Sequence, residues 1–250
     1  MHLFSYYFWK IKILFGRMWN LSYSRKYRII KFMKKHDIKI LNYNDEKYPE
    51  NLKNVSIPPT KLYYMGNVDL LNKKRKIAII GCREYSEYGK IVSEKFAYEL
   101  AKLGFVIISG AARGIDSFSH KETLKTNVGT IAVLGNGLNY IYPPENKELE
   151  EKILENNGLI ISEYDTGTRP SKYTFPARNR IISALSDGVL VIEARKNSGS
   201  QITVDFALDQ GKNVYAVPGD ITRINTEGTN ELIKQGAKIV TCIDDILEDY

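Results

Sequence analysis

The sequence has few of the residues that build disulfide frameworks or metal centres. Its 250 residues include two cysteines, Cys82 and Cys242, which lie far apart and form no Cys-x-x-Cys pair. That pattern is typical of a protein in a reducing compartment. The three histidines, His2, His36 and His120, are too scattered to indicate a metal site. We therefore expect no metal, no cofactor and a cytoplasmic location.

Two nucleotide-binding signatures are also missing. The chain has no Gly-x4-Gly-Lys-Ser/Thr motif, which argues against a P-loop enzyme. Gly135 and Gly137 are separated by one residue, but Tyr140 occupies the place of the third glycine of the dinucleotide fingerprint. A lone Gly-x-Gly is a weak signal, so NAD binding is not predicted.

Acidic residues are absent from the first 36 positions. Residues 1–75 carry 16 Lys and Arg against 5 Asp and Glu, a net +11, whereas residues 76–250 carry 20 against 24, a net −4. The larger part of the chain is therefore not broadly basic. If it binds nucleic acid, it must do so in a local pocket.

Long uninterrupted apolar runs are missing as well. Lys10, Lys12 and Arg17 interrupt the apolar N-terminal stretch, so no membrane span is expected there, and no small-residue cleavage site follows. A basic amphipathic helix that contacts lipid or nucleic-acid phosphates is one interpretation. We favour a small basic helical segment over residues 1–39, followed by a connecting segment over residues 40–75 that packs on the main domain.

From residue 76 onward, apolar runs alternate with amphipathic stretches. Seven runs are rich in Val and Ile: KIAIIG, FVIISG, GTIAVLG, GLIISE, GVLVIEA, NVYAVPG and AKIVT. Near-continuous runs indicate strands buried on both faces, and the alternation indicates repeated βαβ units. Right-handed crossovers then predict an α/β fold over residues 76–250, a doubly wound, mainly parallel sheet with helices on both sides.

Ligands of such sheets bind beyond the carboxyl ends of the strands. One strand ends at Ser109 and Gly110, and the turn that follows carries Arg113 and leads into a helix whose N-terminus suits an anion. Asp116 and His120 share one face of that helix. They are interpreted as structural residues, although with Ser109 they are the nearest thing to a catalytic set.

Two further strand ends carry candidate phosphate contacts. Arg83 lies in a loop above the sheet, where it contacts a phosphate or pairs with a nearby glutamate. Ser198, Gly199 and Ser200 precede a helix, where they either only cap it or also expose backbone amides to a phosphate. The neighbouring Arg195 favours a ligand.

The stretch KYTFPARNR, residues 172–180, begins another helix near Pro176. Arg178 lies on the buried face and is expected to lean over the sheet end, whereas Arg180, about 200° away around the helix, is expected at the rim or in solvent. Cations in a first turn oppose the helix dipole. An anionic ligand, or a carboxylate such as Glu163 or Asp165, would offset that cost.

Lys172 and Phe175 precede that helix. An exposed aromatic ring beside a lysine suits base stacking plus a phosphate contact. The alternative is that Phe175 packs on its own helix as a hydrophobic staple.

Several ordered blocks resemble the DNA-processing protein A family, DprA or Smf: GCREYSEYG, SGAARGIDSFSH, GNGLNYIYPPEN, LIISEY, FPARNRIISALSDGVLVIEA, NSGSQIT and VYAVPG. The resemblance covers about residues 40–240. It implies an extended Rossmann-like fold, binding of single-stranded DNA, loading of the RecA recombinase in natural transformation, homodimerisation, and no enzymatic activity. The family's DNA pocket maps onto seven positions: Arg83, Ser109, Gly110, Lys172, Phe175, Arg178 and Arg180.

One departure from the family pattern is Cys82, which replaces a hydroxyl residue in the first block. The rival hypothesis is a nucleotide-binding enzyme similar to the lysine-decarboxylase-like phosphoribohydrolases. Their Pro-Gly-Gly-x-Gly-Thr loop is missing, and Asp205 is the only acid in the stretch NSGSQITVD that stands in a similar place. A nucleotide-sensing scaffold that does not bind DNA is a third hypothesis. By resemblance, residues 237–250 are the candidate dimer interface.

Overall fold

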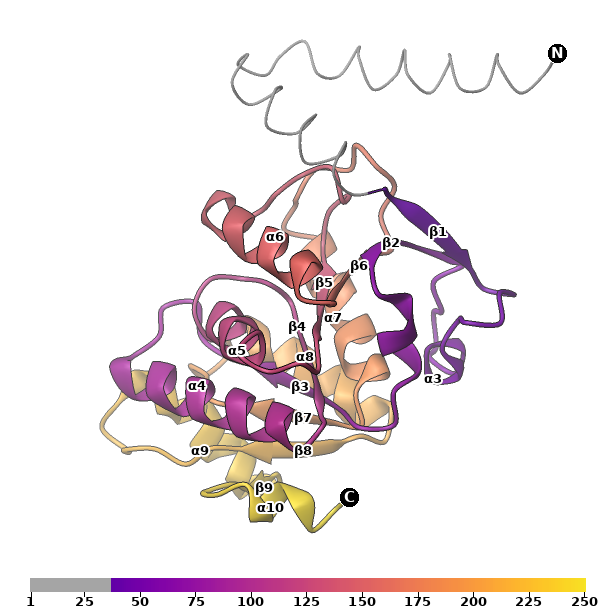
Figure 1. The fold of residues 1–250 in the computed structure, drawn as a ribbon. Coiled ribbons are helices and arrows are strands. Elements are labelled where there is room, and N and C mark those ends of the chain that lie inside the picture. The colour runs from indigo at the N-terminus through magenta and orange to yellow at the C-terminus, as the bar shows by residue number, and fades with distance from the viewer. Residues whose placement is uncertain (1–36) are drawn as a thin grey trace, which may run out of the picture.

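The apolar runs form the strands of one sheet in the computed structural model, which describes residues 37–250 (Figure 1). The seven predicted runs become β3 (Lys76–Ile80), β4 (Val106–Ser109), β5 (Thr130–Leu134), β6 (Leu159–Ser162), β7 (Gly188–Val191), β8 (Asn213–Ala216) and β9 (Lys238–Ile239). Wherever two of these seven strands pair with each other, they are parallel. The predicted doubly wound, mainly parallel α/β fold is confirmed. Residues 1–36 of the predicted helical segment 1–39 lie outside the described residues, and Lys39 already belongs to a strand.

Residues 40–75 extend this sheet. They contain β1 (Lys39–Asn42), α3 (Glu50–Lys53), β2 (Lys61–Gly66) and η1 (Val68–Asn72). β1 pairs with β2 and β2 pairs with β6, both antiparallel, which gives the nine-stranded order β1-β2-β6-β5-β4-β3-β7-β8-β9. The expected connecting segment is therefore an antiparallel extension of the sheet. The sequence pattern was too short to show this, because each strand is bounded by polar and proline-rich turns.

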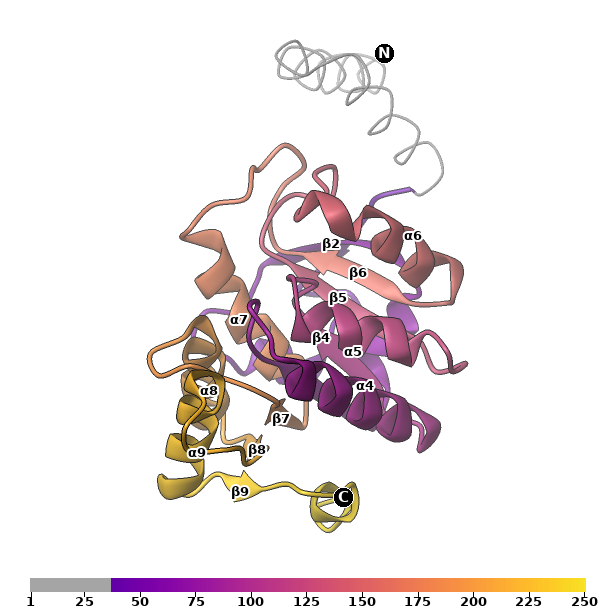
Figure 2. The ribbon, with the colours of Figure 1, turned by 90° about the vertical axis from the view of Figure 1, so that its left-hand side faces the viewer.

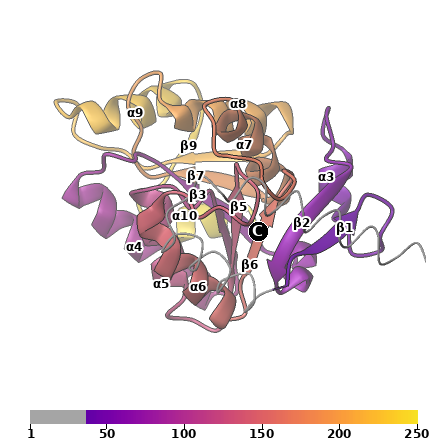
Figure 3. The ribbon, with the colours of Figure 1, turned by 90° about the horizontal axis from the view of Figure 1, so that it is seen from above.

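Helices cover both faces of the sheet. On one side lie α4 (Glu87–Lys102), α5 (Ile115–Thr123) and α6 (Lys147–Glu155), and on the other lie α7 (Thr174–Leu185), α8 (Gly199–Asp209) and α9 (Glu227–Lys234) (Figure 3). The short η2 (Pro144–Asn146) precedes α6, η3 (Ile224–Thr226) precedes α9, and α10 (Asp244–Leu247) follows β9. The side view in Figure 2 shows α7, α8 and α9 along one side of the strands.

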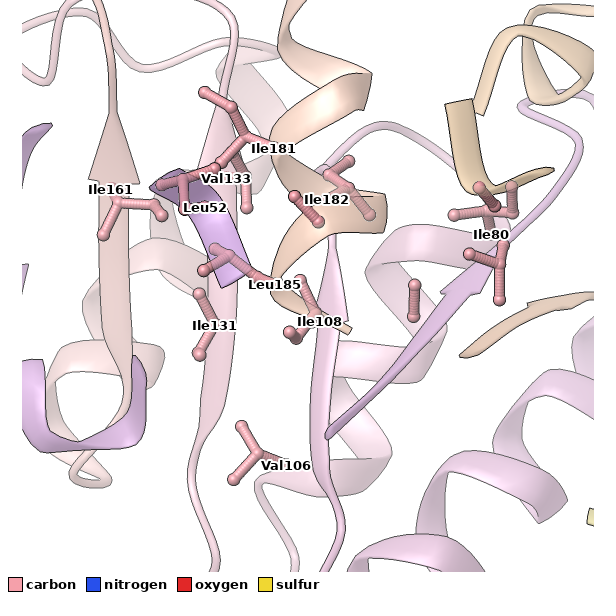
Figure 4. Packing of buried hydrophobic residues seen from close by; sticks show 14 of the residues in the cluster. Leu52, Ile80, Val106, Ile108, Ile131, Val133, Ile161, Ile181, Ile182 and Leu185 are labelled. Atoms are coloured by element: carbon pink, nitrogen blue, oxygen red, sulfur yellow. The ribbon is translucent and has the colours of Figure 1, made fainter. Parts of the chain in front are cut away.

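The core holds α7 firmly against the sheet. Ile181, Ile182 and Leu185 of α7 pack in one buried cluster with Ile108 of β4 and Val133 of β5 (Figure 4). All five side chains are at most 2% exposed, and burial of each contributes about 1.5–3 kcal/mol relative to exposure. The start of α7 is therefore fixed relative to the carboxyl ends of the strands.

The chain changes direction between β3 and β7. These strands are parallel neighbours, with Ile77 opposite Gly188. From β3 the chain builds outward to β6, and from β7 it builds the opposite way to β9. The loops that leave β3 and β7 therefore diverge, and such a topological switch point is where open α/β sheets bind ligands.

Candidate nucleic-acid interface

A cavity of about 490 Å³ lies at this switch point. Its walls come from the loop after β3, the turn before α5, the start of α7 and the first turn of α8. Seven of the predicted site residues line it: Arg83, Lys172, Phe175, Arg178, Ser198, Gly199 and Ser200. The structure thus brings together residues from three separate motifs of the sequence.

Arg178 lies in the floor of the cavity, as predicted. Its guanidinium is buried and its Nη1 donates to the carbonyl oxygens of Gly110, at 2.8 Å, and Val133. Burial lowers the pKa of Arg178 to about 10, a shift that the charge of Asp116 opposes. A Cβ at Gly110 would lie 2.6 Å from Arg178 Nη2, so only glycine allows this approach. Gly110 itself lies behind Arg178 and does not line the cavity. We call Arg178, Asp116 and the underlying Gly110 the floor.

Asp116 completes the floor from α5. Its Oδ2 accepts from the backbone N–H groups of Gly110, at 3.2 Å, and Ala112, at 3.3 Å. Burial raises the pKa of Asp116, and the Arg178 guanidinium is the largest opposing influence. The floor is therefore a pair of compensating charges that also satisfies the backbone of the turn after β4.

Ser109 and His120 are structural. Ser109 Oγ donates to the Ile79 carbonyl oxygen at 2.7 Å, and His120 Nδ1 lies 2.8 Å from Thr130 Oγ1. Both residues are fully buried and neither lines the cavity. Burial, with the nearby Arg178 charge, lowers the pKa of His120 to about 3. The nearest thing to a catalytic set in the sequence therefore has no accessible nucleophile.

The rim of the cavity carries exposed cations and an aromatic ring. Arg83 Cζ lies 5.7 Å from the centroid of the Phe175 ring, which stacks on Tyr142 at 5.3 Å. Lys172 is exposed beside them. Glu84, which follows Arg83 in the sequence, pairs with Arg195 and not with Arg83. We call Arg83, Lys172, Phe175 and Arg195 the rim.

Phe175 packs against the loop after β5. A Cβ at Gly135 would lie 2.8 Å from Phe175 Cδ1, so the first glycine of the Gly-x-Gly stretch makes room for this ring. The ring is partly exposed and lines the cavity. This arrangement agrees better with a presented aromatic platform than with a staple on its own helix.

The first turn of α8 faces the cavity without a side-chain cap. Ser198 is the N-cap residue but makes no side-chain capping bond, and its buried Oγ has no partner within residues 37–250. Gly199 is exposed, and a Cβ there would meet nothing within 4 Å. Uncapped amides at a helix N-terminus favour an anion such as phosphate.

The prediction that Arg180 lies at the rim or in solvent is wrong. The residue is 8% exposed, its two Nη atoms lie 2.8 and 2.6 Å from the Glu163 carboxylate oxygens, and its Nε donates to the Ile57 carbonyl oxygen at 3.0 Å. Ile57, together with Glu163 from the loop after β6, covers Arg180 on the face of α7 opposite Arg178, which a helical projection alone does not show. The expected pairing of Glu163 with an arginine of this segment is confirmed.

Arg113 also lies outside the cavity. Its exposed guanidinium pairs with Glu145, just before α6.

Conversely, sequence reasoning did not select Asn179, Thr203 or Glu84, which line the cavity. Asn179 accepts from Arg178 Nε at 3.1 Å. Two sequence signals could have identified the first two of these residues. Asn179 lies next to Arg178, and Thr203 lies one helical turn after Gly199.

The rival enzyme hypothesis needs an acid near the stretch NSGSQITVD, where Glu193 and Asp205 are the candidates. Glu193 is fully buried and accepts from the backbone N–H of Ser86, at 3.0 Å, and from its hydroxyl, so it caps the start of α4. Asp205 is exposed and accepts from Gln201 Nε2 at 3.0 Å. Neither carboxylate lines the cavity. Cys82 does, and burial raises the pKa of its thiol.

Two searches of the described part of the chain were negative. Within residues 37–250, no group of three His, Cys, Asp or Glu side chains is placed to hold a metal ion. No helix among the described residues combines the length and the apolar character needed to cross a membrane.

The fold and the cavity define a Rossmann-like α/β protein with a basic, aromatic crevice at its switch point. The family model described as "DNA recombination-mediator protein A" matches residues 39–250. DNA processing protein DprA of Bacillus subtilis is 39% identical over 227 residues, which cover 91% of this chain and 76% of the relative. The Streptococcus pneumoniae relative of the same name is 43% identical over 206 residues, covering 82% and 72%. The chain belongs to the DNA recombination-mediator protein A family.

Solved structures agree with this assignment. The crystal structure of DprA from Streptococcus pneumoniae has a TM-score of 0.81 at 39% identity and covers 88% of this chain and 77% of its own. A structure of DNA processing protein A from Helicobacter pylori, reported for its single-stranded DNA binding mode, has a TM-score of 0.76 at 35% identity and covers 86% and 98%. A molybdenum cofactor binding protein from Rippkaea orientalis, at 17% identity and a TM-score of 0.51, shares the fold alone. The resemblance seen in the sequence is confirmed.

Proposed function

We propose that this chain binds single-stranded DNA in the crevice at the switch point and loads a RecA-type recombinase onto it during natural transformation and recombination. One observation carries the proposal. A guanidinium, an ammonium, an aromatic ring and an uncapped helix N-terminus meet in one cavity, although residues 76–250 carry a net charge of −4. That combination suits a strand with accessible bases and phosphates.

The rim and the floor have different roles in this proposal. Arg83, Lys172 and the first turn of α8 contact phosphates, and Phe175 stacks on a base. Arg178 is a positioning residue, because its guanidinium already has Asp116 and two carbonyl oxygens as partners. Gly110 makes room for it. Arg113 and Arg180 have no part in the binding.

No bond needs to break in this activity, so we propose a binding protein rather than an enzyme. Homodimerisation, contact with the recombinase and a cytoplasmic location are part of the same proposal. Their support is the family assignment. Recombinase filament formation on single strands, measured with and without this protein, tests the loading step.

Fluorescence anisotropy with single-stranded and duplex oligonucleotides over a salt series tests the crevice. Binding is expected to prefer single strands, to tolerate sequence, and to weaken with salt at a slope of about −0.7 per phosphate contacted. Arg83→Glu should weaken binding by about tenfold or more. Lys152→Glu is the control, because Lys152 on α6 lies outside the cavity.

Two results would contradict the proposal. Wild-type affinity of Arg83→Glu at physiological salt would show that the crevice is not the DNA site. Binding of a mononucleotide as tightly as a long oligonucleotide would favour a nucleotide-sensing scaffold.

A further inference from the structure

A second hollow of about 420 Å³ adjoins the crevice. It lies between the loop after β3 and the loop that contains η3, and its lining includes Glu84, Tyr85, Arg195, Arg223, Ile224 and Asn225. Glu84 and Arg195 line both the crevice and the second hollow. These two side chains therefore form part of the boundary between the two spaces.

The partition between them is an exposed network. Arg195 Nη2 lies 2.8 Å from a Glu84 carboxylate oxygen, and Arg195 Nε donates to Asn225 Oδ1 at 2.9 Å. Asn225 Nδ2 donates to the Glu84 carbonyl oxygen at 2.8 Å. The Arg195 and Glu84 side chains are 42% and 79% exposed. An ion pair this exposed contributes little to stability, so a phosphate can replace the Glu84 carboxylate as partner of Arg195.

The second hollow offers another cation. Arg223 Nε lies 3.8 Å from Asp220 Oδ2, and both side chains are more than half exposed. Asp220 Oδ1 already accepts from the backbone N–H and the hydroxyl of Thr222. Arg223 is therefore only weakly held by the fold.

The second hollow also offers apolar surface. The Tyr85 ring is held edge-to-face on Phe118, with centroids 4.6 Å apart, and remains 44% exposed. Ile224 is 58% exposed. Two guanidinium groups beside an exposed aromatic ring repeat the chemistry of the crevice on the other side of the partition.

We propose that the second hollow is a further nucleotide subsite, which takes the next part of a single strand already held in the crevice. Arg195 and Arg223 contact its phosphates, and Tyr85 with Ile224 packs on a base. This proposal rests on the proposed function, because the strand reaches the hollow from the crevice. The Glu84 carboxylate turns away as a phosphate takes its place on Arg195.

Oligothymidylates of about 3 to about 12 nucleotides, titrated against Arg223→Ala, test the subsite. The shortest strands should bind as to wild type. The longer strands should bind about three- to tenfold more weakly, with the salt slope reduced by about 0.7. Lys152→Ala is a matched control: Arg223 and Lys152 side chains are both 56% exposed, and each pairs with an acid three or four residues earlier in the chain.

Glu84→Gln provides a second, opposite test. It frees Arg195 and removes a negative charge from the path of the strand, so longer strands should bind about two- to fivefold more tightly. Unchanged or weaker binding would show that a phosphate does not replace this carboxylate.

The outcomes separate the two proposals. If Arg83→Glu weakens all lengths while Arg223→Ala binds every length as wild type does, or weakens all lengths equally, the subsite is wrong and the crevice stands. If Arg83→Glu binds as wild type does, the crevice itself is wrong.

Discussion

Two sets of charged residues surround the same cavity and differ in what already satisfies them. In the floor, Arg178 is buried against two carbonyl oxygens and the charge of Asp116. On the rim, Arg83 and Lys172 are exposed, and they lie over the aromatic rings of Phe175 and Tyr173, respectively. A buried charge with partners belongs to the fold, whereas an exposed cation near an aromatic ring remains available to a ligand.

Neighbours in the sequence do not share the same surroundings in the fold. Arg178 and Arg180 are two residues apart and both are buried, yet one lies in the cavity and the other binds Glu163 on the opposite side of α7. Arg83 and Phe175 are far apart in sequence and lie against each other. The predictions below test whether floor and rim separate stability from binding.

The largest expected effect is on stability, from Arg178→Met. The substitution leaves buried Asp116 without its compensating charge and two carbonyl oxygens without their donor. We expect the free energy of unfolding to fall by about 3–5 kcal/mol in urea denaturation. Arg83→Met, the same change on the rim, should stay within about 0.5 kcal/mol of wild type. Equal losses in the two variants would remove the distinction between floor and rim.

A buried acid away from the cavity provides a second test of how a buried charge without a partner affects stability, here through the pH dependence of unfolding. Glu150 of α6 is fully buried, neither carboxyl oxygen has a partner within residues 37–250, and burial, with the charge of Glu151, raises its pKa to about 8 from 4.5. The folded chain keeps this proton to about pH 8, while the unfolded chain releases it near pH 4.5. Its stabilising contribution is therefore present below about pH 4.5 and is lost as pH rises through about 8.

Glu150→Gln has no proton to lose. Its free energy of unfolding relative to wild type should rise by about 2–3 kcal/mol between about pH 5 and about pH 7, at roughly 1.4 kcal/mol per pH unit. Urea denaturation of both proteins over this range measures the difference. A difference that does not change with pH would show that Glu150 is ionised in the folded chain.

The third effect is on binding. Phe175→Leu removes the aromatic platform of the rim and should weaken single-strand binding by about 1–3 kcal/mol in anisotropy titrations. Tyr173→Leu is the control, because Tyr173 is 74% exposed but does not line the cavity. Similar losses in both variants would mean that the aromatic contribution is not confined to the cavity.

The smallest effect is expected from Lys172→Ala. The exposed side chain contributes little to the fold, so stability should stay within about 0.5 kcal/mol of wild type. Loss of one phosphate contact should reduce the salt slope of binding by about 0.7. A salt series with wild type and Lys152→Ala as references measures this change. An unchanged slope would remove Lys172 from the phosphate contacts.

The sequence predicted the parallel sheet and its ligand-binding end because these depend on repeated patterns. Seven apolar runs became seven strands, and the loops that follow β3 and β7 line the cavity at the switch point. Arg178 was placed correctly from helical periodicity alone. Its partners were not predicted, because the carbonyl oxygens of Gly110 and Val133 reach it only through the folded sheet.

The errors arose where distant segments meet. Arg180 was expected in solvent because nothing in its own helix shows that Ile57 and Glu163 cover it. Arg195 was noticed as a cation, but its bonds to Glu84 and Asn225, and hence the second hollow, depend on three loops. Local sequence identified the chemical groups, whereas tertiary contacts decided which of them remain exposed.

The antiparallel pair β1 and β2 has a consequence for the limits of the folding unit. β2 occupies the outer edge of β6 along four residue pairs, from Tyr63 opposite Ser162 to Gly66 opposite Leu159. A fragment beginning at residue 76 would leave that edge open, with unpaired main-chain groups beside apolar side chains, which is a template for aggregation. The smallest fragment expected to stay monodisperse therefore begins at β1, ahead of every residue of the crevice.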